Sequence, residues 1–349
     1  MKKFVAKKFQ ANLLNWYRKN ARALPWRACD PRKANPYHVW LSEIMLQQTV
    51  VKTVIPYFEN FTTKWRTVHD LAKAPEDQIL KAWAGLGYYA RARNLIKCAR
   101  QIVEDHNGIF PDDETVLLKL SGVGAYTAAA IRAIAFNKSA IVVDGNIERI
   151  ASRVFKVEEF LPAAKLTLKI KAAEFYKHDS SPAEMAQALM DLGATICIPK
   201  APRCTQCPVS EFCKLNGQKE AGLYPRKQAK SERPERLGHA FIFYTKSGQI
   251  FLEKRAENGM LGGMLGLPTS DWDKAGNVVD YNIKSTRKIG IVRHIFSHFT
   301  LHLTVKSKCI TADEIKILKR KGQFVELSEI DKAGLPSVFL KAIKLFTAS

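Results

Sequence analysis

The chain has 349 residues, which exceeds one ordinary domain and favours two. Hydrophobic residues make up 46% of it, but no apolar run reaches the roughly 18 to 20 residues that a membrane helix needs, so the sequence predicts no membrane span. Lysine and arginine number 55 against 33 aspartates and glutamates, a net charge of +22 that predicts a polyanionic partner, nucleic acid above all; charge kept for solubility alone is the alternative.

Helical periodicity dominates residues 4–223, as in "SEIMLQQTVVKTVIPYF" and "YARARNLIKCARQIVEDH", and predicts an all-α domain over residues 1–224. The basic start, "MKKFVAKK", runs into an amphipathic helix without a cleavage site, so we expect no secretion signal and an intracellular protein. Two prolines and dense charge in "YPRKQAKSERPERLG" predict a linker at residues 225–236. Residues 237–349 predict an α+β domain, with strands in "HAFIFYTKSGQIFLEKR" and "HIFSHFTLHLTVKSKCI" and a helix near "PSVFLKAIKLF".

Four of the seven cysteines lie in one loop, residues 197–213, with the spacing C-x6-C-x2-C-x5-C; they are Cys197, Cys204, Cys207 and Cys213. This clustering indicates a metal site and not disulfides. Four thiolates can ligate either a zinc ion or an iron–sulfur cluster. Zinc sites usually come as two C-x2-C pairs, so uneven spacing around a single pair favours a [4Fe–4S] cluster. Lys200 and Arg203, within the loop, suit contacts with a phosphate backbone.

The stretch "LLKLSGVGAYTAAAIRAIAF" predicts a helix, a turn and a second helix. Gly122, Val123 and Gly124 present backbone N–H groups where the helix dipole favours an anion, which suits a phosphate clamp; an ordinary helical-hairpin turn is the alternative. Farther on, a strand-like apolar run ends at Asp144-Gly-Asn146 before another helix. Either polar residue suits an N-cap, but a carboxylate held ionised there can also stabilise or attack a cationic sugar.

These motifs together resemble the iron–sulfur branch of the helix-hairpin-helix DNA glycosylases, and most closely the MutY family of adenine glycosylases. The segments that carry the resemblance cover most of residues 16–213 and include "LSGVGAYTAAAI", "VVDGNIERI", "WLSEIMLQQTVVKTVIPYF", "GLGYYARARNL" and "MDLGATICIPKAPRCTQCP". It implies base-excision repair by a protein with a [4Fe–4S] cluster, working on nucleoid DNA in the bacterial cytoplasm. Nothing in the sequence requires more than a monomer. Such an enzyme flips adenine opposite 8-oxoguanine or guanine out of double-stranded DNA and hydrolyses its N-glycosidic bond. Two departures are the longer link "ACDPRKAN" at residues 28–35 and Ser121 where the family commonly has proline.

The resemblance implies a catalytic set of Glu43, Tyr126, Asp144 and Asn146. Glu43 protonates the adenine and Asp144 stabilises or captures the sugar cation; the apolar surroundings in "VWLSEIMLQQ" suit a proton donor. The alternative for Glu43 is a carboxylate in the first turn of a helix after Ser42. Relatives that also cleave the strand carry a lysine nucleophile at the position of Tyr126. A phenol forms no imine, which implies a monofunctional glycosylase, unless the ring only faces the hairpin core.

Further DNA contacts follow from the resemblance: Gln48 and Tyr88 in or beside the duplex, Leu46 and Gln187 around the extruded base, and Arg91 and Arg93 at phosphates. Leu46 and Tyr88 equally suit a hydrophobic core.

Residues from Leu237 onward resemble the degenerate Nudix-like domain of the same glycosylases, in "ENGMLGGMLGLP" and "FSHF". The magnesium-binding pattern R-E-x-x-E-E is missing from the sequence, which disfavours pyrophosphate hydrolysis. In this family a loop that matches Phe296, Ser297 and His298 recognises 8-oxoguanine. The alternative for these residues is a strand of alternating apolar and polar side chains.

Two other functions stay open from the sequence. One is an endonuclease III-like glycosylase and lyase, against which Tyr126 and the second domain count. The other is an iron–sulfur protein that binds DNA as a redox sensor without catalysis, which leaves Glu43 and Asp144 unexplained.

Overall fold

The computed structural model describes residues 4–28, 30, 33–177, 181–228, 232–256, 259–273, 286–319 and 322–349. Parts of the predicted linker and of the loop at residues 28–35 lie outside these residues. The chain forms two compact units, a first unit of Met1–Lys73 with Asn94–Ala229 and a second unit of Ala74–Arg93 with Lys230–Ser349. Ala74–Arg93 therefore lies in the helical half by sequence but is grouped by packing with the C-terminal residues.

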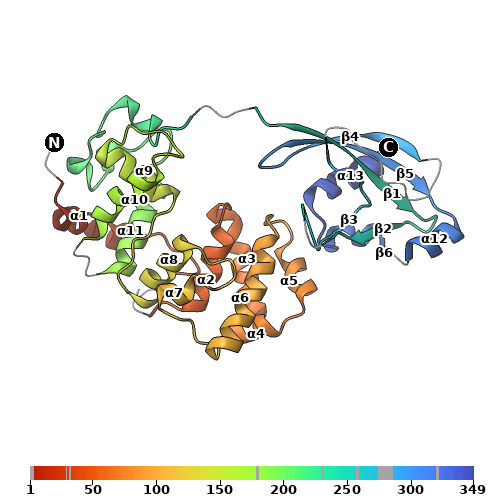
Figure 1. The fold of residues 1–349 in the computed structure, drawn as a ribbon, viewed down its shortest axis with the longest axis horizontal. Helices are drawn as coiled ribbons and strands as arrows, with labels where there is room; N and C mark the ends of the chain where they lie inside the picture. The colour runs from red at the N-terminus through yellow and green to blue at the C-terminus, as the bar shows by residue number, and fades with distance from the viewer. Residues whose placement is uncertain are drawn as a thin grey trace. The chain divides into compact units, whose positions relative to one another are not determined.

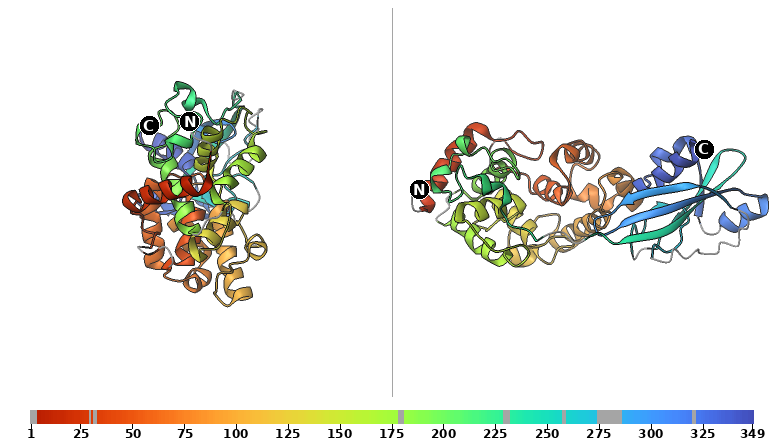
Figure 2. Two further views of the ribbon diagram at one scale, coloured as in Figure 1. Left: turned by 90° about the vertical axis from the view of Figure 1, so that its left-hand side faces the viewer. Right: turned by 90° about the horizontal axis from the view of Figure 1, so that it is seen from above.

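Helices make up the regular structure of the first unit (Figures 1 and 2), as the apolar periodicity predicts. They are α1 Ala6–Asn20, α2 Pro36–Leu46, α3 Val51–Lys64, α4 Val68–Lys73, α6 Ala90–His106 (which begins in the second unit), α7 Glu114–Leu117, α8 Ala125–Phe136, α9 Gly145–Phe155, α10 Lys165–Ala173 and α11 Pro182–Thr195. Short 3-10 helices are η2 Glu174–Tyr176, η3 Cys204–Gln206, η4 Ser210–Phe212 and η5 Lys219–Leu223. No described helix is long and apolar enough to cross a bilayer.

The core of the first unit is built on α2 and α8, which pack on each other. Asn35 caps α2 by accepting from the Tyr37 N–H, and Pro36 at the first helical position has no N–H to leave unsatisfied. Helix α8 in turn packs on α11, and α11 packs on α1 and α9. The strand-like run before Asp144 is not a strand: Val142 is buried and its carbonyl accepts from the Tyr176 hydroxyl at 2.7 Å. The helices packed around it offer no backbone ladder for a strand to join.

The second unit is built on a mixed sheet. Its strands are β1 Glu235–Tyr244, β2 Gln249–Lys254, β3 Leu265–Gly266, β4 Arg287–Ile295, β5 Thr300–Cys309 and β6 Gly322–Glu326, in the order β3-β2-β1-β5-β4 with β6 also paired to β2. Strands β1 and β5 run parallel, with Glu235 opposite Thr300, while β4 and β5 form an antiparallel hairpin. The helices are α5 Glu76–Trp83, α12 Ala312–Lys319 and α13 Ser337–Thr347, with the 3-10 helix η6 Leu327–Lys332.

Alternation along the strands gives the sheet two apolar faces. Ala240 and Ile242 of β1 share a core with Phe339 of α13, whereas Phe241 of β1 lies in another core with Leu318 of α12. Successive side chains of a strand point to opposite faces, so one strand supplies both cores. The predicted strands and the predicted C-terminal helix are confirmed.

Candidate functional site

Glu43 lies in the second half of α2, not in its first turn, so the alternative of a first-turn carboxylate is wrong. The residue is only 5% exposed, because α2 is enclosed by other helices. Burial raises the pKa of Glu43 to about 7; a hydrogen bond from Tyr126 lowers it in part, and the negative charge of Asp144 raises it further. Glu43 is therefore a carboxyl that keeps its proton to a much higher pH than an exposed glutamate does.

Tyr126, the second residue of α8, faces this carboxyl and not merely the hairpin core. Its hydroxyl donates to Glu43 Oε2 at 2.8 Å. Burial, and after it the charges of Glu43 and Asp144, raise the pKa of the phenol well above its ordinary value. Tyr126 is thus a neutral phenol that donates a hydrogen bond to Glu43.

Asp144 is the N-cap of α9, and its Oδ1 accepts from the Ile147 N–H at 2.7 Å. Its other oxygen, Oδ2, accepts from the Asn146 amide at 2.8 Å, and the carbonyl of that amide accepts from Arg149. The interpretation of Asp144 as an N-cap is therefore confirmed. Capping does not exclude a catalytic role, because hydrogen-bond donors and a helix N-terminus also stabilise a carboxylate that faces a cationic sugar. Gly193 of α11 packs against Asn146, and a Cβ at Gly193 would lie 2.5 Å from the Asn146 Cβ.

A cavity of about 50 Å³ opens beside Glu43. Its lining residues are Arg22, Leu24, Trp26, Arg27, Val39, Ser42, Glu43, Leu46, Val51, Ile134, Gln187 and Met190. Leu46 is partly exposed here and is not a core residue. Gln187 is 5% exposed, and its amide donates to the Ala183 carbonyl at 3.1 Å. The structure thus brings Leu46 and Gln187 to the cavity where Glu43 lies.

Sequence reasoning missed a charged group in the wall of this cavity. The Arg27 guanidinium makes a two-pronged contact with Asp191 of α11, with both N–O distances 2.7 Å. Arg22 adds a side-chain contact to Asp191 at 2.6 Å. The sequence does contain a signal for this pair. Arg27 in "LPWR" and Asp191 in "MDLG" are charged residues in apolar stretches, and a charge buried there needs a partner of opposite sign.

Gly122, Val123 and Gly124 form the turn before α8, for which the sequence predicts a phosphate clamp. Gly122 has φ +78°, and a Cβ there would lie 2.8 Å from the Asn94 Cβ. Val123 is buried, and Gly124 is the N-cap of α8 without a side-chain cap. Glycine has no side chain that could accept from the first N–H groups of α8. These N–H groups therefore have no side-chain cap, as a backbone contact with phosphate requires.

Gln48 and Tyr88 share an uncommon backbone conformation. Their φ angles are +58° and +49°, and both side chains are exposed. Strained, exposed positions of this kind are concentrated at functional sites. The exposure of Tyr88, 48%, argues against its being a core residue. Its hydroxyl lies 2.7 Å from that of Ser297 within the second unit.

Arg91 differs from the prediction of a phosphate contact. It is 8% exposed, and its guanidinium donates to the carbonyls of Leu86 and Gly87. Burial lowers its pKa to about 10. Arg91 therefore supports the turn that carries Tyr88. Arg93 is partly exposed, and its guanidinium donates to the Gly262 carbonyl.

Phe296, Ser297 and His298 lie in the turn between β4 and β5, so the alternative of a strand is wrong. The ring of Phe296 stacks on Phe299 with centroids 4.9 Å apart, and is partly buried. Ser297 and His298 are exposed. The packed phenylalanine thus anchors a turn whose next two side chains face outward.

All four predicted cysteine ligands line one cavity of about 30 Å³. Burial raises the pKa of Cys207 to about 12 and that of Cys213 to about 11, so these thiols lose their protons only where a cation compensates. Arg153 of α9 donates to Cys197 Sγ at 3.3 Å. Among the described residues no three His, Cys, Asp or Glu side chains meet closely enough to hold a single metal ion. Four cysteine side chains around one cavity are the type of donor set that an iron–sulfur cluster uses.

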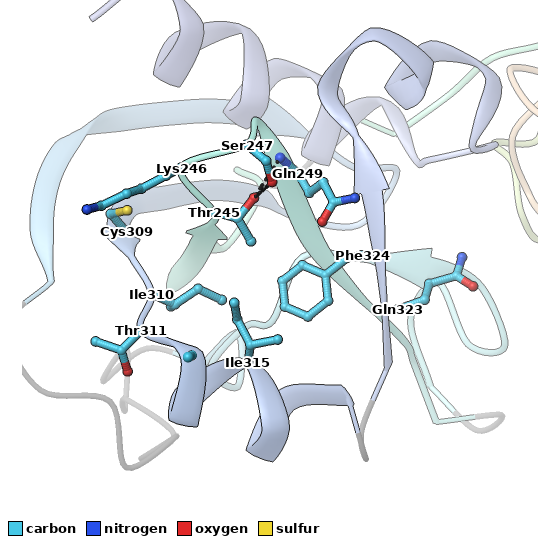
Figure 3. Close-up of a pocket in the computed structure, with 11 residues that line it drawn as sticks. Thr245, Lys246, Ser247, Gln249, Cys309, Ile310, Thr311, Ile315, Gln323 and Phe324 are labelled. Atoms are coloured by element: carbon cyan, nitrogen blue, oxygen red, sulfur yellow. Dashed lines mark hydrogen bonds between the residues drawn. The ribbon is translucent and has the colours of Figure 1, made fainter.

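The second unit contains a larger and more open cavity, of about 1070 Å³ (Figure 3). It lies where the β1–β2 turn, the end of β5, the start of α12 and β6 meet, with Lys246, Cys309 and Phe324 in its lining. None of the predicted site residues lines it.

Comparison with known proteins gives two family matches and close relatives. Residues 41–175 match the HhH-GPD superfamily base excision DNA repair proteins, and residues 239–345 match the NUDIX domain. Adenine DNA glycosylase of Buchnera aphidicola subsp. Schizaphis graminum is 33% identical over 349 residues, 97% of this chain and 98% of that one. Adenine DNA glycosylase of Homo sapiens is 37% identical over 286 residues, 80% of this chain and 50% of that one. The solved structure of a thermostable thymine-DNA glycosylase is 30% identical, with a TM-score of 0.53 over 60% of this chain and 95% of that one.

Proposed function

Because the chain belongs to the adenine DNA glycosylase family, we propose that it excises adenine paired with 8-oxoguanine or guanine in double-stranded DNA and leaves an abasic site. The observation that carries the proposal is the buried Glu43, hydrogen-bonded by Tyr126 and facing a cavity, with the charge of Asp144 acting on it. A protonated carboxyl and a second carboxyl are what the cleavage of a glycosidic bond needs.

In this reaction Glu43 donates its proton to the adenine ring and makes the base a better leaving group. Asp144, as an anion at a helix N-terminus, stabilises or captures the sugar cation that forms as the bond breaks. Asn146 orients Asp144 through its amide. Leu46 and Gln187 line the cavity and contact the extruded base.

The enzyme releases the base without cleaving the strand. Tyr126 stands where a bifunctional glycosylase needs an amine, and the described residues that line the cavity include no lysine. Schiff-base chemistry requires such an amine, so an endonuclease III-like lyase is the weaker candidate. A redox sensor without catalysis is a still weaker candidate, because that function does not explain a buried carboxyl with a raised pKa.

DNA binding is assigned to three groups of residues and to Arg93. The N–H groups after Gly122, Val123 and Gly124 bind a phosphate, and Gln48 and Tyr88 enter or flank the duplex. Ser297 and His298 read 8-oxoguanine from the β4–β5 turn that Phe296 anchors. Arg93 approaches phosphate near Tyr88. The enzyme acts as a monomer on chromosomal DNA in the bacterial cytoplasm.

Cys197, Cys204, Cys207 and Cys213 are assigned as ligands of a [4Fe–4S] cluster. The spacing around a single C-x2-C pair, the common cavity and the Arg153 hydrogen bond to Cys197 Sγ support this assignment. A cluster would hold the loop rigid and present Lys200 and Arg203 to the DNA backbone.

The test is a labelled duplex with adenine opposite 8-oxoguanine, incubated with the protein and analysed with and without hot alkali. We expect strand cleavage only after alkali, because base loss alone leaves an alkali-labile site. Cleavage without alkali would establish a lyase, and no cleavage under either condition would refute glycosylase activity on this substrate. Asp144→Asn is the matched variant: a glycosylase loses turnover and keeps its DNA affinity, whereas a binding protein is unaffected.

A further inference from the structure

Asp191 is the most completely enclosed carboxylate near the candidate active site. Its side chain is 0% exposed, and its two oxygens accept from both terminal nitrogens of Arg27, from Arg22 Nε and from the Arg22 backbone N–H. Burial alone raises the pKa of Asp191, but the hydrogen bond and charge of Arg27, together with Arg22, bring that pKa below its ordinary value. Asp191 is thus an anion that these two arginines stabilise.

Arg27 connects this anion to the catalytic cavity. Arg27 and Glu43 line the same cavity, and the charge of each acts on the other. The Arg27 side chain is 10% exposed, so solvent screens its charge poorly. A cation beside a carboxyl favours the carboxylate, whereas a general acid must keep its proton until the base leaves. An uncompensated Arg27 would therefore oppose catalysis.

We propose that Asp191 is a positioning residue that neutralises and orients Arg27 in the cavity wall and so keeps Glu43 protonated for transfer to the base. This inference rests on the proposed function, in which Glu43 is the acid. The other groups acting on Glu43 are Tyr126 from α8 and Asp144 before α9. Among the described residues, the Asp191 carboxylate has Arg22 and Arg27 as its partners and makes no hydrogen bond or ion pair with Glu43, so Asp191 acts on Glu43 through Arg27.

The test compares the pH dependence of single-turnover adenine release for the whole protein, Asp191→Asn, Arg27→Met and the double variant. Release falls at high pH as Glu43 loses its proton, which defines an alkaline limb. Asp191→Asn leaves the Arg27 charge uncompensated, so we expect the limb to move down by about one pH unit, a rate loss of about tenfold well above the limb. Arg27→Met removes the cation, and we expect the limb to move upward. The double variant should return toward the wild-type limb.

Opposite shifts of the two single variants are the signature of the proposed charge compensation. A residue with a merely structural role slows release at every pH and leaves the limb in place, and that result would overturn the inference. Asp191→Asn deprives two arginines of their acceptor and is the variant at risk of misfolding, which circular dichroism detects. Arg27→Met leaves Asp191 with Arg22 as its partner, so this variant does not share that risk, and a limb that fails to move upward in it would overturn the inference even if Asp191→Asn does not fold. Failure of the wild-type protein to release adenine would instead count against the proposed function.

Discussion

Replacing Glu43 by glutamine should abolish base release and at the same time stabilise the protein at alkaline pH. Burial raises the pKa of Glu43 from 4.5 to about 7. Between these pH values the unfolded chain has lost a proton that the folded chain still holds, so folding stability falls as the pH rises through this window. The difference of roughly 2.5 pKa units corresponds to about 3 kcal/mol once the pH exceeds the folded pKa. Glutamine has no proton to lose and avoids this penalty.

The assay is urea unfolding, followed by circular dichroism, at about pH 5 and about pH 8 for wild type and Glu43→Gln. We expect the wild-type free energy of unfolding to fall by about 2 to 3 kcal/mol more than that of the variant between the two conditions. Glu104→Gln, on an exposed position of α6, is the matched control and should follow the wild type. Equal pH dependence of wild type and Glu43→Gln would refute the argument that burial holds this carboxyl protonated.

Tyr126→Phe removes a hydrogen bond that lowers the pKa of Glu43, so we expect the alkaline limb of the pH–rate profile to move to higher pH in single-turnover assays; an unmoved limb would contradict this. Gly193→Ala introduces a Cβ 2.5 Å from that of Asn146. We expect this overpacking to cost about 1 to 3 kcal/mol, seen as a lower Tm, and to slow base release; a wild-type Tm would show that the contact relaxes freely. Cys207→Ser removes a proposed cluster ligand and should reduce the bound iron and visible absorbance of the purified protein, whereas full iron content would exclude Cys207 from the ligand set.

The sequence alone was sufficient for the class and order of the two folds. Apolar residues at three- and four-residue spacing predicted the helices around α2 and α8, and alternation predicted strands such as β1, because these periods follow from local backbone geometry. The same local logic failed at Val142, which joins no sheet among the described residues. Pairing in a sheet needs a neighbouring strand, which no local pattern supplies.

The chemical groups of the candidate site could also be identified from the sequence. They are a carboxyl in "SEIM", a tyrosine after a Gly-Val-Gly turn and an aspartate before a helix. Only the tertiary structure decided their environment: that Glu43 is buried and bonded to Tyr126, and that Arg27 meets Asp191 across 164 positions of the chain. Arg91 illustrates the same limit, because its place beside a functional turn was readable but its burial was not. Burial and the distance between charges depend on which distant segments pack together. The protonation of a carboxyl depends on its burial and on the charges near it, so the tertiary structure determines it and the residue type alone does not.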